Sequence, residues 1–218
     1  DFALFYDVYF GEAGNPDPIS VNNGESVSYI YQEPGVYTIR VVSKSAAIAT
    51  TEHVEDFTVT LVNKPNTSAS TPPNRQAADV ISIFSSKYTD VAGTNYFPDW
   101  GQAGQGSSWA EFDLNGDKML NYINLSYQGI ALADNTSINV SGMEYLHMDV
   151  WTANLSALEI FLISRATGEK SIVKTLTANA WTSIDIPISA FTSQGGFTVA
   201  DIFQLKLDTD PVPGKSVY

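Results

Sequence analysis

The chain has 218 residues, no cysteine and a formal net charge of −13 at pH 7. Because phosphate groups are bound through clustered lysine and arginine, this charge argues against nucleic acids and anionic membrane surfaces as partners. The lack of cysteine excludes a disulfide framework, a thiol nucleophile and a cysteine-ligated zinc site. No apolar run approaches the length of a membrane-spanning segment. A neutral ligand fits this composition best.

The first 62 residues are expected to form short strands separated by turns. Runs rich in β-branched and aromatic residues alternate with clusters of Asn, Pro and Gly, and no helical period is visible. The expected strands cover residues 3–10, 26–31, 35–43 and 54–62.

A resemblance to a known family becomes specific within residues 27–41. An aromatic residue, a turn at Pro34-Gly35 and the alternation that begins at Tyr37-Thr38 resemble the second half of a polycystic-kidney-disease (PKD) domain. Residues 6–12 resemble an earlier strand of the same domain. The resemblance implies an immunoglobulin-like sandwich over residues 1–62, acting as a spacer.

Residues 63–75 are interpreted as a linker. They contain Pro65, Pro72 and Pro73 and no large apolar side chain. Prolines make such a segment semi-rigid. The linker divides the spacer from a second module at residues 76–218.

The second module is predicted to be a β-sandwich of the jelly-roll type, so that the whole chain is all-β. Many short strands at regular spacing are typical of this architecture. Asn115-Gly116 lies between two of the strands and predicts a two-residue hairpin turn. The expected strands cover residues 80–84, 109–113, 118–125, 145–151, 157–164, 170–176, 181–187 and 202–207.

Two of the four tryptophans are expected outside the core. Trp100 falls in a segment rich in Pro, Asn, Asp and Gly, which indicates a loop. Trp151 shares one face of an alternating strand with His147 and Asp149, opposite an apolar row. Exposed rings beside polar side chains suit a sugar, whose C–H face stacks on an aromatic ring while its hydroxyls form hydrogen bonds. Trp181, at the start of a strand, is assigned to packing.

Alternation also assigns faces in residues 201–208. Phe203, Leu205 and Leu207 form one row, which is expected in the core. Gln204 and Lys206 lie in the opposite row and are expected to face solvent. The second module therefore presents a polar face.

Four segments of the second module, residues 82–90, 98–102, 122–129 and 147–151, carry a second resemblance. Together and in this order they resemble the carbohydrate-binding jelly rolls of marine Bacteroidota. These modules are appended to laminarinase-type glycoside hydrolases and occur in surface glycan-binding proteins of polysaccharide utilisation loci. The resemblance implies non-catalytic binding of a neutral polysaccharide, foremost a laminarin-like β-1,3-glucan, outside the cell or at the outer-membrane surface.

In this interpretation Trp100 and Trp151 are stacking platforms for the sugar. The implied partners besides the glycan are outer-membrane glycan-uptake proteins or a catalytic module. An export signal is expected to have been removed or to lie upstream. The residues expected to contribute hydrogen bonds or to lie beside them are His147, Asp149, Gln204, Lys206, Asn124, Tyr127 and Gln128.

Two other functions remain open at this stage. The chain could be a pair of structural domains that space or dock the catalytic module of a glycoside hydrolase. It could also be a glycosidase, because Glu111 and Asp113 match the first two carboxylates of a Glu-x-Asp-x-x-Glu motif. Gly116 stands where the third carboxylate belongs, which argues against catalysis.

No cofactor is required for glycan binding. The two histidines, His53 and His147, do not form a metal-binding or catalytic set. Structural calcium is common in sandwiches of this kind, so the resemblance allows a calcium ion without naming its ligands.

Overall fold

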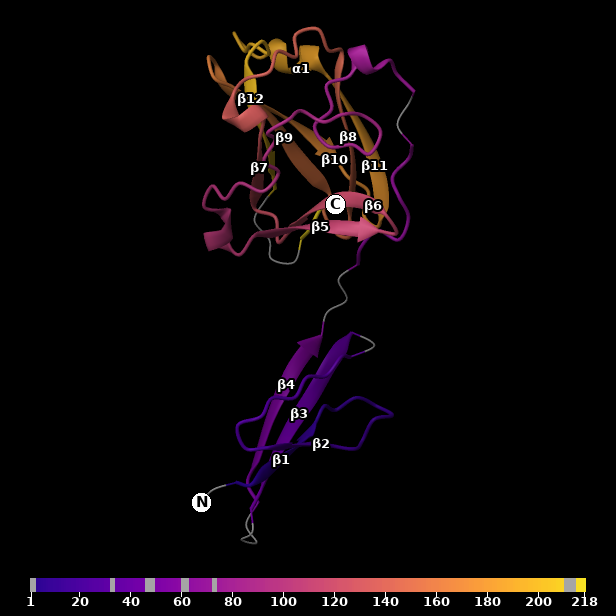
Figure 1. The fold of residues 1–218 in the computed structure, drawn as a ribbon, viewed down its shortest axis with the longest axis vertical. Coiled ribbons are helices and arrows are strands. Elements are labelled where there is room, and N and C mark those ends of the chain that lie inside the picture. The colour runs from indigo at the N-terminus through magenta and orange to yellow at the C-terminus, as the bar shows by residue number, and fades with distance from the viewer. Residues whose placement is uncertain (1–2, 32–33, 46–49, 60–62, 72–73, 210–214) are drawn as a thin grey trace. The chain divides into compact units, whose positions relative to one another are not determined.

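The structure is a computed structural model that describes residues 3–31, 34–45, 50–59, 63–71, 74–209 and 215–218. The chain forms two compact units, Asp1–Val62 and Asn63–Tyr218. Its regular structure is almost entirely antiparallel strand (Figure 1), so the prediction of an all-β fold is confirmed. None of the helices described is long and apolar enough to cross a membrane.

Unit 1, Asp1–Val62, contains an antiparallel sheet with the strand order β2-β1-β3-β4. Its strands are β1 (Phe5–Tyr9), β2 (Ile19–Asn22), β3 (Gly35–Lys44) and β4 (Glu52–Val59). The strand expected at residues 26–31 is not formed, and a strand that was not expected occurs as β2. Among the described residues of this unit there is no second sheet, and residues 60–62 of the last expected strand lie outside the description.

Aromatic rings explain why residues 26–31 do not add a strand. Tyr31 stacks on Tyr37 of β3 with ring centroids 4.0 Å apart, and Tyr29 stacks on Phe10 at 4.4 Å. The Tyr31 hydroxyl donates a hydrogen bond to the Phe10 carbonyl at 2.9 Å. These rings lie over the sheet face that carries Tyr37 and Phe57, which are paired across β3 and β4. The segment covers the sheet instead of extending it.

Unit 2, Asn63–Tyr218, is a sandwich of two sheets. We call them the β9 sheet, with the order β10-β9-β12-β7, and the β8 sheet, which contains β5-β6 and β8-β11. Val217 forms bridges to both Tyr122 of β6 and Thr152 of β8, and so joins the two halves of the β8 sheet. The strands of the β9 sheet are β7 (Tyr127–Ala131), β9 (Ala157–Ser164), β10 (Gly168–Thr175) and β12 (Ile202–Asp208). Those of the β8 sheet are β5 (Ser108–Leu114), β6 (Asp117–Ile123), β8 (Tyr145–Thr152) and β11 (Ala180–Pro187).

The observed strands of this unit differ from the expected ones at residues 80–84 and 118–125, and they include β7, which was not expected. Residues 80–84 form no strand, and Ser82 makes only an isolated bridge to Asp90. The run expected at residues 118–125 ends at Ile123, and β7 begins separately at Tyr127. The hairpin prediction is confirmed, because Asn115 and Gly116 both have positive φ angles, 55° and 97°, between β5 and β6.

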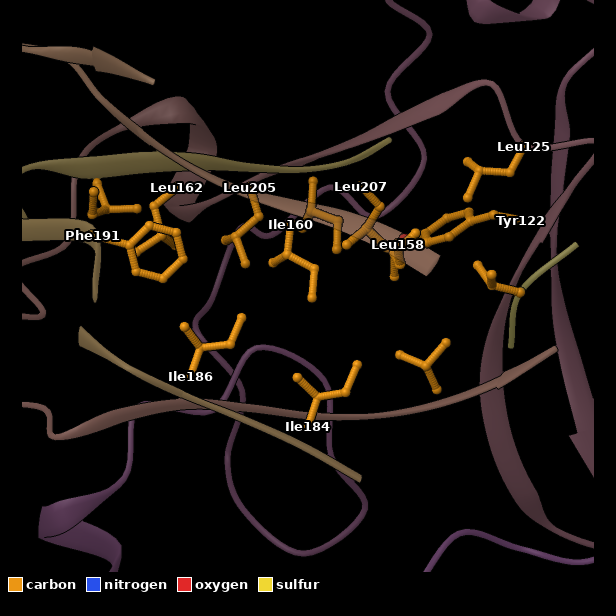
Figure 2. Packing of buried hydrophobic residues seen from close by; sticks show 14 of the residues in the cluster. Tyr122, Leu125, Leu158, Ile160, Leu162, Ile184, Ile186, Phe191, Leu205 and Leu207 are labelled. Carbon is orange, nitrogen blue, oxygen red and sulfur yellow. The ribbon is translucent and has the colours of Figure 1, made fainter. Parts of the chain in front are cut away.

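The core fills the space between the two sheets (Figure 2). Alternation places every second side chain of a strand on the inner face. Ile160 of β9 and Ile186 of β11 are completely buried, and so is Phe191 of the short helix α1 (Ile188–Thr192), which follows β11. Truncating a large side chain of this core to alanine is expected to lower the free energy of unfolding by about 2–5 kcal/mol.

One core prediction is wrong at β12. Leu205 and Leu207 are buried as expected, but the register shifts between Ile202 and Gln204. This irregularity reverses the faces at the start of the strand, as bulges do. Ile202 is therefore buried, and Phe203 is only half-buried, with the Arg165 guanidinium 4.2 Å from its ring centroid.

The first residues of the predicted linker pack on unit 2, and we call residues 63–67 the strap. Pro65 is almost completely buried. The Asn63 amide donates to Asn179 at 3.0 Å, and the Lys64 ammonium lies 5.3 Å from the ring centroid of Phe112. The Thr67 carbonyl accepts a hydrogen bond from the Trp181 indole at 2.8 Å. The strap thus contacts both β5 and β11 of the β8 sheet.

Candidate functional site

The outer face of the β9 sheet gathers several of the residues predicted to bind a ligand. Register pairs Gly129 of β7 with Lys206 of β12, and Lys206 with Phe161 of β9. Because pairing partners share a face, these positions form one row across three strands. Tyr127, Gln204 and Asp208 lie on the same face by alternation.

Trp100 lies on this row although it belongs to the preceding loop. A Cβ atom built on Gly129 would come within 2.1 Å of the Trp100 ring, so the indole rests directly on the backbone of β7. The indole is half-buried. A partly exposed aromatic ring of this kind can serve as a stacking surface for a ligand.

Hydrogen bonds hold the Trp100 backbone in place. The Tyr127 hydroxyl donates to the Trp100 carbonyl at 2.9 Å, and the Trp100 amide donates to the Gln102 side chain at 2.6 Å. Gln102 is completely buried, and its amide donates in turn to Gln128 at 3.0 Å and to the Pro98 carbonyl at 2.7 Å. A satisfied buried network of this kind makes a loop rigid.

The expectation that Gln128 contacts a ligand is therefore corrected. Its side chain points inwards, opposite Leu207, and is 1% exposed. It donates to the Pro98 carbonyl at 3.1 Å and accepts from Gln102. Gln128 positions the loop that carries Trp100.

Charged groups lie beside Trp100 on the same face. The Lys206 ammonium is 3.1 Å from both carboxylate oxygens of Glu169, 3.9 Å from Asp208 and 3.7 Å above the ring of Phe161. Burial raises the pKa of Asp208, Lys206 opposes that shift, and Glu159 and Glu169 add to it. The amide of Gln204 donates to Asn135 at 3.3 Å. Three carboxylates against one ammonium make this face unfavourable for an anionic ligand.

The other predicted polar residues lie on the opposite sheet. His147 and Asp149 belong to β8, where the His147 imidazole is 2.8 Å from Asp185 and 3.5 Å from Asp149. Because β8 and β9 belong to different layers, this cluster does not share a face with Trp100. The sequence motifs were assigned to one site, and the structure separates them into two.

The expected exposure of Trp151 is wrong. This tryptophan is 6% exposed, and its ring meets Tyr218 edge-on with centroids 5.6 Å apart. The backbones of Trp151 and Tyr218 also exchange two hydrogen bonds of 3.0 Å. Alternation places the indole on the outer face, but Tyr218 packs against it. Trp151 therefore cannot act as a stacking platform in this conformation.

Asn124 lies in the turn between β6 and β7 and has a φ of 49°. Its amide donates to the Gly106 carbonyl at 3.5 Å. The residue is exposed, and its place in the turn accounts for it without a ligand.

Both motif carboxylates of the hairpin between β5 and β6 contact neighbouring groups of the hairpin itself. Glu111 is 2.6 Å from the Lys118 ammonium, and Asp113 accepts the backbone N–H of Gly116 at 2.6 Å. Within the described ranges, no group of three or more His, Asp or Glu side chains is placed to hold a metal ion. A structural calcium ion stays a prediction without assigned ligands.

Sequence reasoning missed three residues of the β9 face. Alternation in residues 157–164 could have placed Phe161 outwards, opposite Leu158 and Ile160. Glu169 is found only through its ion pair with Lys206. Gly129 carries no sequence signal, because its importance comes from the close approach of Trp100.

The comparisons with known proteins add little. No protein-family model and no curated protein matches the chain. One similar solved structure comes from work on the structural basis for the promiscuous specificity of carbohydrate-binding modules from the β-sandwich superfamily. It is 12% identical, covers 99% of this chain and 82% of its own, and has a TM-score of 0.34. A similarity with so low a TM-score and identity is too weak to assign a function.

Proposed function

We propose that unit 2 is a non-catalytic module that binds a neutral polysaccharide on the outer face of the β9 sheet. The observation that carries the proposal is the indole of Trp100, held on Gly129 beside Lys206. A ring that packs on a strand, and whose backbone is held by a buried network, can stack on a sugar at little cost in conformational entropy. The neighbouring Gln204, Lys206 and Asp208 supply donors and acceptors for hydroxyl groups.

The charge of the face supports a neutral ligand. Glu159, Glu169 and Asp208 would repel uronate or sulfate groups, and the chain as a whole carries −13 charges. Within the neutral glycans we propose a laminarin-like β-1,3-glucan, on the sequence resemblance alone.

The same resemblance supports a location outside the cell or at the outer-membrane surface. Unit 1 then serves as a PKD-like spacer. The glycan-binding unit would work beside outer-membrane uptake proteins or a catalytic module.

Affinity electrophoresis and calorimetry of the full chain test the proposal. The panel is laminarin, mixed-linkage glucan, xylan, mannan and the anionic control alginate. We expect micromolar to millimolar affinity for a neutral glucan and no binding of alginate, because polar desolvation offsets much of the contact energy. Trp100→Ala should weaken binding by about 1–3 kcal/mol, the loss of an aromatic anchor.

The matched control is Trp181→Phe, which changes a tryptophan under the strap on the other sheet and should leave glycan binding unchanged. If no neutral glycan retards the chain, the binding function is wrong, and a spacer or docking role would explain the module better. Reducing ends released from laminarin, and lost in Glu111→Gln, would instead establish a glycosidase.

A further inference from the structure

A groove of about 500 Å³ lies where β8 begins and β11 ends, beside α1. Its apolar side is formed by Met143, Ile188 and Val199, of which the last two are almost fully buried. Its rim carries Tyr145, Glu144 and Ser189. The volume lies within the range of small-molecule sites.

Tyr145 gives this groove an exposed aromatic wall. Its side chain is 52% exposed, and among the described residues of unit 2 no other aromatic residue belongs to the exposed large hydrophobic side chains. Register places it opposite Pro187 on β11, at the end of the strand pair. The ring is thus presented at the sheet edge, clear of the strap that contacts Trp181 further along β11.

Polar groups stand beside that ring. The Glu144 backbone carbonyl accepts the Ile188 N–H at 2.9 Å, which fixes the start of β8 against α1. For the Glu144 carboxylate, no hydrogen bond or ion pair is found within the residues that the structure describes. An exposed carboxylate on a backbone that is fixed in this way can accept hydrogen bonds from two hydroxyl groups.

We propose that this groove is a second carbohydrate site, which accepts one neutral sugar ring. The sugar stacks its C–H face on Tyr145 and donates hydroxyl groups to Glu144, over the apolar floor of Ile188 and Val199. Glu144 disfavours an anion, and the hydroxyl-bearing rim of Ser189 and Thr192 disfavours a purely apolar ligand. The site belongs to the β8 sheet and does not require the β9 face to bind.

Titration of the ¹⁵N-labelled full chain with glucose, galactose and mannose, followed by NMR, tests this site. We expect at least one of the three sugars to shift the amides of residues 141–145 and 188–192 in a saturable way, with millimolar affinity. Tyr145→Ala and Glu144→Gln should each weaken that binding by about fivefold, the loss of one modest contact. Tyr145→Phe keeps the ring and should bind nearly as well as the native chain.

The matched control is Glu55→Gln, an exposed carboxylate of unit 1, which should leave the titration unchanged. Absence of saturable shifts in both segments with all three sugars overturns the proposal. So does an equal response of Tyr145→Ala and the native chain, with folding of the variant verified by its dispersed spectrum.

The Trp100→Ala variant separates this site from the proposed function. Groove shifts that persist in Trp100→Ala support an independent site. Groove shifts that disappear in that variant assign the signal to the β9 face and overturn the second site. If no polysaccharide is retained but the groove still titrates, the proposed function fails and the second site stands.

Discussion

The two outer faces of unit 2 have similar sequence patterns, but one is open to solvent and the other is covered by other segments of the chain. On the β9 sheet, Trp100 and Lys206 remain at the surface. On the β8 sheet, Trp151 lies in an outward row but is covered, with Pro65 of the strap also buried. Alternation thus identifies the direction of a side chain and leaves open whether another segment later packs on it.

The outer face of the β8 sheet is covered by the first and the last residues of unit 2, which are the strap and Tyr218. Tyr218 packs edge-on against Trp151 and Phe112, and the strap holds Trp181 through the Thr67 carbonyl. These contacts convert rings that could have bound a ligand into part of the hydrophobic packing. The comparison therefore predicts that tryptophans of the β8 face serve stability and that Trp100 serves binding.

Truncating Trp151 should have the largest effect. Trp151→Ala removes a buried indole from beneath Tyr218 and is expected to cost about 3–5 kcal/mol of unfolding free energy. Trp100→Ala, which removes a half-buried ring, should cost clearly less. Urea denaturation of both variants measures the difference, and equal losses would contradict the division between a covered and an open face.

Substituting Gly129 should disrupt the open face without removing any of its side chains. In Gly129→Ala the new methyl group would lie 2.1 Å from the Trp100 ring, so the indole must leave its position. We expect glycan affinity to fall about tenfold or more, equivalent to roughly 1.4 kcal/mol. Gly104→Ala is the matched control, because nothing lies within 4 Å of its added Cβ. Unchanged affinity in Gly129→Ala would remove Trp100 from the site.

Removing the hydrogen bond between Trp181 and the strap should change stability less than the substitutions above. Trp181→Phe keeps an aromatic ring but removes the donor to the Thr67 carbonyl, which should lower the unfolding free energy by about 0.5–1.5 kcal/mol. In the native chain the Trp181 indole N–H should exchange with solvent more slowly than that of Trp100. Hydrogen exchange followed by NMR measures this, and equal exchange rates would show that the strap does not stay on the β8 sheet.

The sequence was sufficient for features that depend on near neighbours. Asn115-Gly116 predicted the hairpin because only a few residue types adopt two successive positive φ angles. Leu205 and Leu207 were placed in the core by alternation alone. Phe203 was assigned to the wrong face because the register of β12 shifts between Ile202 and Gln204. The shift leaves the order of apolar and polar residues unchanged, so the sequence does not reveal it.

The site was harder to predict because it depends on contacts between distant segments. Trp100 meets Gly129 across 29 positions, and Trp181 meets the strap across 114. His147 and Asp149 were grouped with Trp100 because all carried sugar-binding chemistry, although their strands belong to different sheets. Residue type predicted the chemistry, and only the topology could assign it to a face.

The smallest expected effect concerns the ionisation of Asp208 on the open face. Its pKa is raised from 3.8, chiefly by burial, so the folded chain holds this proton more tightly than the unfolded chain does. The resulting contribution to stability is complete below pH 3.8 and is lost as the pH rises through the folded pKa. Asp208→Asn should therefore be slightly more stable than the native chain at pH 7, by up to about 0.5 kcal/mol because the group is partly solvated. The advantage should vanish below pH 3.8. Thermal melts at pH 3 and pH 7 measure it, and a variant less stable at pH 7 would show that the contact with Lys206 outweighs burial.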